Sequence, residues 1–310
     1  MIASDDRRDA ENAEITQRNP LSNVRVRHMK YLVSLLLLLA LQPFHANQRS
    51  RKPAVAPIGL QLYSLRNQFQ ADVPSTLDQV RSFGIKYVEL AGTYGLKPQA
   101  FNAELKARGL RAISAHFSYE RFRDHLDDVI REARVFELQY VGCAWIDHPH
   151  PIDEKTVREI AAVFNRAGEL LAKNNLKFFY HIHGYEFAPY KKGTLFDLLA
   201  AETNPRYVLF QMDVYWVVNA GQNPVGLLRH YGNRFVSLHL KDIKAGTPHN
   251  LLGESDIENN VVLGQGTIKW SDLIRTAKEV GVKWYFLEDE SSKSVTQIPE
   301  SLRFLETLRL

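Results

Sequence analysis

Residues 207–240 read YVLFQMDVYWVVNAGQNPVGLLRHYGNRFVSLHL and hold one complete strand-helix-strand repeat. The apolar runs at both ends have the length and composition of buried strands, and residues 222–231 between them have a helical pattern. Pro224 lies near the start of that helix, where a missing N–H costs nothing. Gly232 lies at its end, where a residue tolerant of positive φ is favoured. This alternation predicts parallel strands joined by helices.

The same alternation fills the chain from Ile58 onward. Eight apolar runs are predicted strands: 58–63, 86–90, 111–116, 139–144, 177–183, 207–213, 235–240 and 283–288. Helical patterns lie at 73–83, 98–108, 121–137, 153–174, 194–201, 222–231, 269–280 and 295–308. Eight alternations in about 250 residues predict an α/β fold, a single (β/α)8 TIM barrel over residues 58–310. The alternative, a doubly wound open sheet, would place a glycine-rich turn after the first strand, and LQLYSLR at 60–66 has no glycine cluster.

The leader differs from the body in composition. Residues 1–28 are polar and irregular, and we expect a disordered extension there. Residues 29–46 combine a basic start, the run YLVSLLLLLAL and a small residue at Ala46, which is typical of a secretory signal peptide. The apolar run is shorter than the ~20 residues that span a bilayer, although an uncleaved anchor or a buried helix is the alternative. We read residues 47–57 as a linker and expect export to the periplasm or the cell exterior.

Charge and cysteine content exclude several classes of protein. The first 57 residues carry nine Lys/Arg and five Asp/Glu, and subtracting these from the totals of 39 and 35 leaves 30 of each in the body. A formally neutral body argues against a nucleic-acid partner. The single cysteine, Cys143, excludes an intrachain disulfide framework and a thiolate-rich metal cluster.

Polar side chains gather where the predicted strands end, which is where such barrels build active sites. Residues two apart on a strand share a face, so these side chains would point to one side. They are Gln61, Tyr63, Glu89, His116, His181, His183, Gln211, Asp213, Ser237, His239, Lys241 and Glu288. Seven of the eight predicted strands thus end in an ionisable group. Burying so much charge in a small volume is costly unless an ion compensates it, so we expect a divalent cation.

One ligand is expected from each of the last four strands: His183, Asp213, His239 and Glu288. Imidazole and carboxylate together suit Mn²⁺, Zn²⁺, Co²⁺ or Fe²⁺ better than Ca²⁺, which prefers oxygen ligands throughout. His181 and Lys241 lie close by in the sequence and are predicted to transfer protons.

Six segments carry a family resemblance: YVELAG (87–92), FFYHIHGYEF (178–187), QMDVYWVVNAG (211–221), SLHLKD (237–242), VVLGQGTIKW (261–270) and YFLEDE (285–290). In this order they resemble the sugar phosphate isomerase/epimerase family of the xylose isomerase-like TIM-barrel superfamily, over essentially residues 58–310. The HLKD and LGQGTIKW elements, with their order and spacing, are more specific than the short YVEL element.

The resemblance implies a single divalent metal, often Mn²⁺, at the mouth of the barrel. In ketose epimerases of this superfamily the ligands run Glu, Asp, His, Glu along strands five to eight. Asp213, His239 and Glu288 match the last three positions, whereas His181 and His183 stand where the first glutamate would be. This His-x-His pattern resembles members that act as inosose dehydratases or as lyases on 3-keto-glycosides.

The implied activity is proton abstraction next to the carbonyl of a sugar or keto-sugar. Reprotonation would make the protein an isomerase or epimerase, and loss of a β-substituent would make it a 3-keto-glycoside lyase or a dehydratase. The predicted catalytic residues are Glu288, Lys241 and His181. The predicted substrate contacts are Glu89 and His116 through hydrogen bonds, and Tyr63 and Trp145 through their ring faces. The structural alternatives are a salt bridge from Lys241 to Asp242 or Glu288 and packing of Glu89 and His116 inside the barrel.

Two other classes of function compete with a sugar enzyme. A metal-dependent endonuclease-like hydrolase on the same barrel would use a three-zinc cluster, which needs roughly twice as many ligands and a basic groove. A non-catalytic sugar-binding barrel would keep the aromatic residues and tolerate loss of the metal. We expect a small-molecule carbohydrate as the partner, no nucleic acid, and no stable membrane insertion unless the leader stays uncleaved.

Overall fold

The computed structural model describes residues 55, 57–149 and 151–310. The predicted extension at 1–28 and signal peptide at 29–46 lie outside the described residues, as does nearly all of the linker at 47–57. Within the described part, none of the helices is both long and apolar enough to cross a bilayer.

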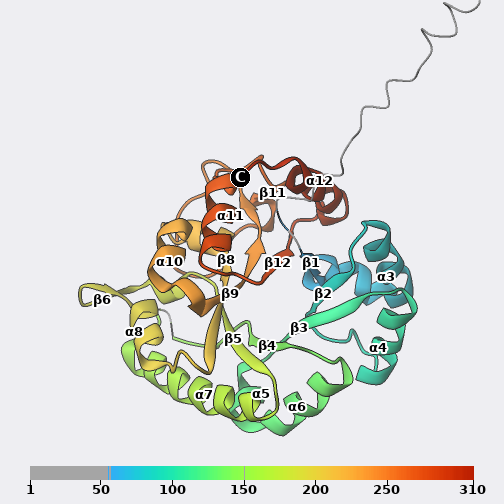
Figure 1. Ribbon diagram of the computed structural model, residues 1–310. Helices are drawn as coiled ribbons and strands as arrows, with labels where there is room; N and C mark the ends of the chain where they lie inside the picture. The colour runs from blue at the N-terminus through green and yellow to red at the C-terminus, as the bar shows by residue number, and fades with distance from the viewer. Residues whose placement is uncertain (1–54, 56, 150) are drawn as a thin grey trace, which may run out of the picture. The chain divides into compact units, whose positions relative to one another are not determined.

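Eight parallel strands close into a barrel, which confirms the predicted (β/α)8 fold (Figure 1). They are β1 (Ile58–Gln61), β2 (Tyr87–Leu90), β3 (Arg111–Phe117), β4 (Tyr140–Cys143), β5 (Lys177–Ile182), β8 (Val208–Asp213), β9 (Phe235–Leu240) and β12 (Trp284–Leu287). Strand β1 closes the barrel because it pairs with β2 on one side and β12 on the other, with Gly59 opposite both Tyr87 and Phe286. All eight strands were predicted from their apolar runs.

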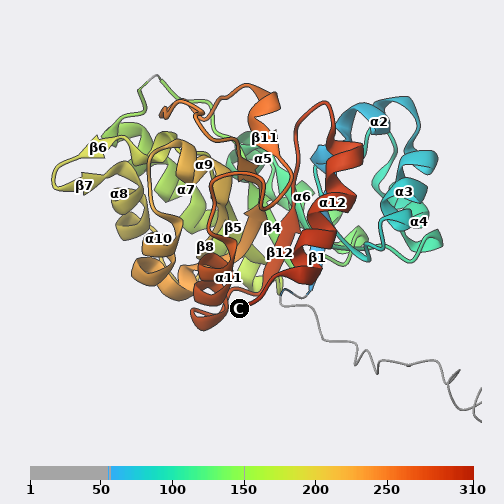
Figure 2. The same ribbon diagram turned by 90° about the horizontal axis from the view of Figure 1, so that it is seen from above.

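Helices form a ring around the strands (Figure 1). They are α2 (Arg66–Ala71), α3 (Val73–Ser82), α4 (Pro98–Ala107), α5 (Tyr119–Asp124), α6 (Leu126–Val135), α7 (Glu154–Lys173), α8 (Leu195–Glu202), α9 (Val214–Asn219), α10 (Pro224–Tyr231), α11 (Trp270–Glu279) and α12 (Ser294–Thr307). The long helices bury an apolar face against the barrel and expose a charged one, as their periodicity predicts. A hairpin of β6 (Pro189–Tyr190) and β7 (Gly193–Thr194) projects at the side, next to α8 (Figures 1 and 2).

The interior of the barrel is apolar toward one end and polar toward the other. Phe179 and Phe286 are buried inside it, two positions before His181 and Glu288 on the same strand faces. The space for these rings comes from glycine, since a Cβ on Gly142 would lie 2.2 Å from the ring of Phe179. The aromatic layer therefore forms a floor beneath the polar strand ends.

The segment after β9 contributes Gly253 to the lining of the cavity described below. It contains the short antiparallel pair β10 (Asp242–Ile243) and β11 (Asn260–Val261), with the 3-10 turn η4 (Ile257–Asn259) just before β11. The buried Asp242 carboxylate holds the segment, because it accepts the backbone N–H groups of residues 243, 264, 266 and 268 and the indole N–H of Trp270. Gly266 is required there, since a Cβ would lie 2.2 Å from Asp242 Oδ1. The HLKD and LGQGTIKW elements are thus joined by one carboxylate.

Candidate active site

A cavity of about 500 Å³ opens at the C-terminal ends of the strands. Its wall includes the predicted site residues Tyr63, His116, Trp145, His181, His183, His239 and Glu288. Three other predicted residues lie below the wall rather than on it, with 0%, 0% and 1% of their surface exposed: Glu89, Asp213 and Lys241. The structure therefore gathers all ten predicted residues around one volume, in two layers.

Tyr63 lies in this wall because of a turn after strand β1, whereas we expected it to lie at the end of the strand itself. Strand β1 ends at Gln61, whose side chain accepts the backbone N–H of Tyr63 and starts the 3-10 turn η1 (Leu62–Leu65). Tyr63 is therefore not on the strand, and its ring is 42% exposed. Trp145, which follows β4, is 36% exposed, so the cavity presents two aromatic rings to solvent.

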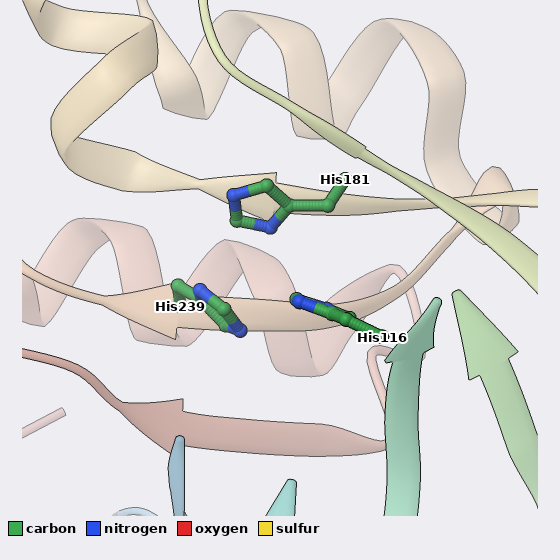
Figure 3. A group of neighbouring side chains, drawn as sticks. All are labelled: His116, His181 and His239. Atoms are coloured by element: carbon green, nitrogen blue, oxygen red, sulfur yellow. The ribbon is translucent and has the colours of Figure 1, made fainter. Parts of the chain in front are cut away.

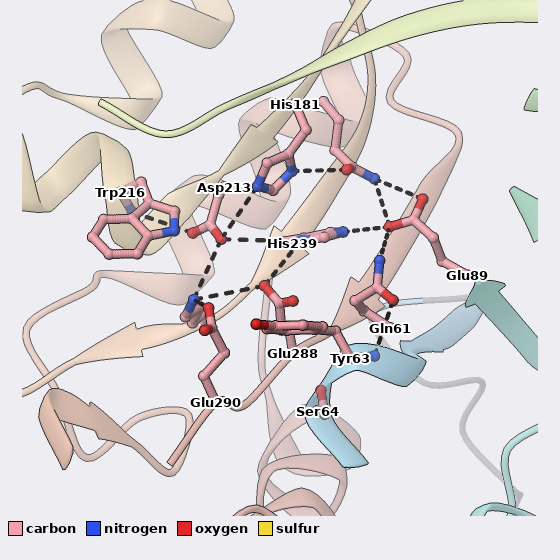
Figure 4. A network of polar contacts seen from close by, with 12 residues as sticks. Gln61, Tyr63, Ser64, Glu89, His181, Asp213, Trp216, His239, Glu288 and Glu290 are labelled. Atoms are coloured by element: carbon pink, nitrogen blue, oxygen red, sulfur yellow. Dashed lines mark hydrogen bonds and ion pairs between the residues drawn. The ribbon is translucent and has the colours of Figure 1, made fainter. Parts of the chain in front are cut away.

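Asp213, His239 and Glu288 bring three donor atoms within 4.8 Å of one another. His239 Nδ1 lies 3.0 Å from Glu288 Oε2 and 3.9 Å from Asp213 Oδ2 (Figure 4). Two donors that each lie ~2.1 Å from one ion are separated by roughly 3–4 Å, so these spacings fit a shared cation.

Asp213 supplies the clearest sign that this group fits a cation. Its Oδ1 accepts the backbone N–H of Trp216, but Oδ2 is buried and has no hydrogen-bond partner among the residues described. Burial raises the pKa of Asp213 to about 7, against the opposing effect of the Lys241 ammonium. A buried oxygen left without a partner is costly, and a metal ion would satisfy it.

Glu89 holds His239 from the opposite side. Its Oε1 lies 2.5 Å from His239 Nε2, and its Oε2 accepts the hydroxyl of Ser114 at 2.5 Å. The side-chain amides of Gln61 and Gln211 also donate to it. We expected Glu89 to contact substrate, but the structure places it below the wall with both oxygens occupied. Its position is that of the carboxylate that commonly orients a metal-binding imidazole.

The Glu89 and Glu288 carboxylates govern the charge on His239. Burial on its own would lower the pKa of this imidazole, but the two carboxylates raise it to about 10. Burial alone would raise the pKa of Glu288, but the Lys241 ammonium and the His239 ring hold it well below its usual range.

Gln211 sets the tautomers of two histidines. Its amide nitrogen donates to Glu89 and, at 3.0 Å, to Ser237 Oγ, so its carbonyl oxygen must face the other way. That oxygen accepts from His181 Nδ1 at 2.8 Å and from His116 Nε2 at 3.0 Å. His181 therefore carries its proton on Nδ1 and keeps a lone pair on Nε2, which lies 3.9 Å from Asp213 Oδ2.

His116, His181 and His239 form a second close group, and their rings gather at the strand ends (Figure 3). His116 has no nitrogen to spare, because Nε2 faces Gln211 and Nδ1 lies 3.4 Å from the Gln61 amide nitrogen. We therefore assign no ion to this group. The same bonds leave His116 no free nitrogen for the substrate hydroxyl that we expected it to bind.

His183 lies beyond the end of β5 and lines the cavity. Its Nδ1 is buried without a hydrogen-bond partner in the described part of the chain, and its ring contacts that of Trp145 edge-on at 5.1 Å. Burial and the Lys241 ammonium lower its pKa to about 3, so the ring is neutral. His181, in contrast, forms a close group with His116 and His239, and its Nε2 lies 3.9 Å from Asp213 Oδ2. The geometry thus favours His181 over His183 as the ligand from β5.

Glu186 fixes the chain just after β5, which the sequence pattern did not suggest. Its carboxylate is buried and accepts the backbone N–H groups of His183 and Gly184 and the hydroxyl of Tyr180. Gly184 has φ 102°, so the chain turns away from strand geometry there. The position of His183 is therefore set by this turn and not by strand alternation.

Lys241 lies between three carboxylates. Its Nζ pairs with Glu290 and lies 3.7 Å from Glu288 Oε2 and 3.8 Å from Asp213 Oδ2. Burial alone would lower its pKa, but these carboxylates raise it above the usual range. Lys241 is thus held as a cation and is poorly suited to act as a base. Sequence reasoning missed Glu290 as the main partner of Lys241. The expected alternative, a salt bridge from Lys241 to Asp242, does not form, because the Asp242 carboxylate accepts backbone N–H groups instead.

Comparisons with known proteins agree with this fold. The family model described as xylose isomerase-like TIM barrel matches residues 77–308. An inosose dehydratase of Clostridium beijerinckii is 30% identical over 243 residues, which cover 68% of this chain and 80% of that protein. The solved structure of a sugar phosphate isomerase/epimerase from Parabacteroides distasonis has a TM-score of 0.68 at 22% identity, over 81% of this chain and 98% of that one. A structure of the IolI protein with a bound zinc atom has a TM-score of 0.62 at 12% identity, over 80% and 94%.

Proposed function

The chain belongs to the xylose isomerase-like TIM barrel family, and we propose that it is a divalent-metal-dependent lyase acting on a keto-sugar. In the proposed reaction a proton is removed next to the carbonyl and a β-substituent, either water or an alcohol, is eliminated. The observation that carries the proposal is the buried, unpartnered Asp213 Oδ2 beside His181, His239 and Glu288. A histidine where ketose epimerases have glutamate, together with inosose dehydratases among the relatives, favours elimination over epimerisation.

The proposed ligand atoms are His181 Nε2, Asp213 Oδ2, His239 Nδ1 and a Glu288 oxygen. Mn²⁺ suits this mixed set, and Zn²⁺, Co²⁺ or Fe²⁺ would also fit. When bound, the ion would polarise the substrate carbonyl and make the neighbouring C–H more acidic. Glu89 and Gln211 keep the imidazoles of His239 and His181 in the orientation and tautomer that this requires.

Residues of the chain itself supply the proton transfers. His183 lines the cavity and its imidazole is neutral, so this ring is placed to take the proton from carbon. The C–H electron pair becomes the new C=C bond, and the β-substituent leaves with its bonding pair and takes up the proton that His183 has accepted. Lys241 contributes positive charge close to where negative charge develops on the carbonyl oxygen. Tyr63 and Trp145 are positioned to pack on a sugar ring.

A substrate panel tests the proposal. The purified protein is supplied with Mn²⁺ and assayed on 3-keto-glycosides, an inosose and free ketoses, with and without a chelator. We expect elimination products that disappear on chelation and return with metal. Faster epimerisation of the free ketoses would overturn the choice of elimination. Cleavage of abasic DNA would favour an endonuclease, and sugar binding without any turnover would favour a non-catalytic barrel.

We also propose that the protein is exported, on the basis of the signal-like pattern at residues 29–46. N-terminal sequencing of the protein recovered outside the cytoplasm of the expressing cell would test this. An N-terminus after residue 46 is expected, whereas full-length protein in the cytoplasm would contradict it.

A further inference from the structure

Glu120 and Asp147 supply the negative charge that a ligand would meet in the cavity wall, because Glu288 is a proposed metal ligand and Glu290 pairs with Lys241. Four carboxylates line the cavity: Glu120, Asp147, Glu288 and Glu290. Within the described ranges, no lysine or arginine is part of the wall. Both ring nitrogens of His239 face the carboxylates of Glu288 and Glu89, so this ring offers no free N–H group to a ligand.

The cationic side chains beside the wall already bind other groups of the protein. Lys241 is 1% exposed and pairs with Glu290. Arg66 stacks on the outer wall residue Tyr63 at 4.5 Å and donates to the backbone carbonyl oxygens of Tyr63 and Glu290, so these N–H groups are not free for a phosphate. Arg121 pairs with Glu132 at 2.9 Å. Helix α5 begins at the wall but has Glu120 in its first turn, so its N-terminus offers an anion no net advantage.

We propose that the substrate is an uncharged sugar and that the site excludes sugar phosphates, a proposal that rests on the function given above. With the reacting carbonyl at the Asp213, His239 and Glu288 group, the far end of the sugar points to the outer wall. A phosphate there would carry about −1.5 to −2 charges at neutral pH and would face Glu120 and Asp147. Phosphate sites normally provide arginine, lysine or a helix N-terminus, and this wall provides none of these in usable form. The site thus differs in specificity from what the name of its sugar phosphate isomerase/epimerase neighbour suggests.

The test measures binding and not turnover. Isothermal titration of the Mn²⁺-loaded protein compares glucose and methyl glucoside with glucose 6-phosphate, none of which the enzyme is expected to transform. We expect the uncharged sugars to bind about tenfold tighter or more, with the gap narrowing as salt screens the repulsion. Equal or tighter binding of glucose 6-phosphate, or no binding of the uncharged sugars, would overturn the proposal.

Charge reversal makes the test specific to the wall. Glu120→Lys should raise the affinity for glucose 6-phosphate several-fold relative to that for glucose. Asp124→Lys, which lies at the other end of α5 and outside the cavity wall, is the matched control and should change neither. Because the binding measurement does not depend on turnover, a failure to eliminate would refute the proposed function without affecting this result. Conversely, preferred elimination from a sugar phosphate would sink only this inference.

Discussion

The Glu89→Gln substitution tests whether the carboxylate beneath the wall serves the metal centre. Glutamine keeps the size of the side chain and an oxygen for His239 Nε2, which lies 2.5 Å from Glu89, but it removes the negative charge. A hydrogen bond to a charged group contributes about 1.5–3 kcal/mol, and one between neutral groups about 0.5–1.5 kcal/mol. The difference is about 1–1.5 kcal/mol, which corresponds to metal binding weakened roughly 5- to 15-fold. This agrees with the lower end of the ~10- to 100-fold losses usual for such supporting groups.

The assay is a competition between the protein and a chelating indicator for Mn²⁺ or Zn²⁺, with a thermal melt to confirm folding. Ser114→Ala is the matched control, because the Ser114 hydroxyl bonds the other oxygen of Glu89 at 2.5 Å. That variant leaves the charge and the bond to His239 in place, so its metal affinity should fall by no more than about threefold. Unchanged affinity in Glu89→Gln, or an equal loss in Ser114→Ala, would refute the assignment of Glu89 as the orienting carboxylate.

Three further predictions address the ligand choice, the loop and the thiol. His181→Ala should lower the metal content per chain in elemental analysis, whereas His183→Ala should keep the metal and lose ~100-fold or more in turnover; the reverse pattern would make His183 the ligand. Asp242→Asn should lower the free energy of unfolding by about 1–3 kcal/mol in urea melts and expose residues 244–268 to protease, and an unchanged melt would contradict the anchoring role. Cys143 is fully buried and burial raises the pKa of its thiol, so Ellman's reagent at pH 8 should label it only after unfolding; fast labelling of native protein would argue against that burial.

The barrel could be predicted because its signals are local. Each strand is a short apolar run and each long helix an amphipathic stretch, so no distant contact is needed to recognise them. The misses occur where a local signal is ambiguous. Helix α9 was overlooked because Val214–Asn219 is short and almost wholly buried, and it reads as a continuation of strand β8. The pattern at 121–137 was read as one helix, but the chain breaks at His125, whose φ and ψ of −133° and 40° are not helical.

The same difference between local and long-range signals applies to the residues of the site. Strand alternation was enough to predict that Asp213, His239 and Glu288 would lie close together, because each stands within one residue of the end of its strand. It was not enough to separate His181 from His183. The two would share a face on a continuing strand, but β5 ends at Ile182 and the chain then turns. Which nitrogen is free depends on Gln211, a contact across two strands that no sequence spacing reveals.

A comparison of three buried carboxyl groups near the strand ends shows that burial alone does not explain the unpartnered oxygen of Asp213, whereas a bound cation does. Asp242 and Glu89 are as deeply buried, at 1% and 0% exposure, and the protein gives each of them donors for both oxygens. Asp213 is also 0% exposed, yet one of its oxygens lacks a donor in the described structure while two imidazoles and an ammonium lie 3.8–3.9 Å away. All three distances are too long for hydrogen bonds, and the two imidazole distances suit donor atoms arranged around a common ion. A fold that satisfies two such carboxylates completely has left the third open on the side where the other proposed ligands converge.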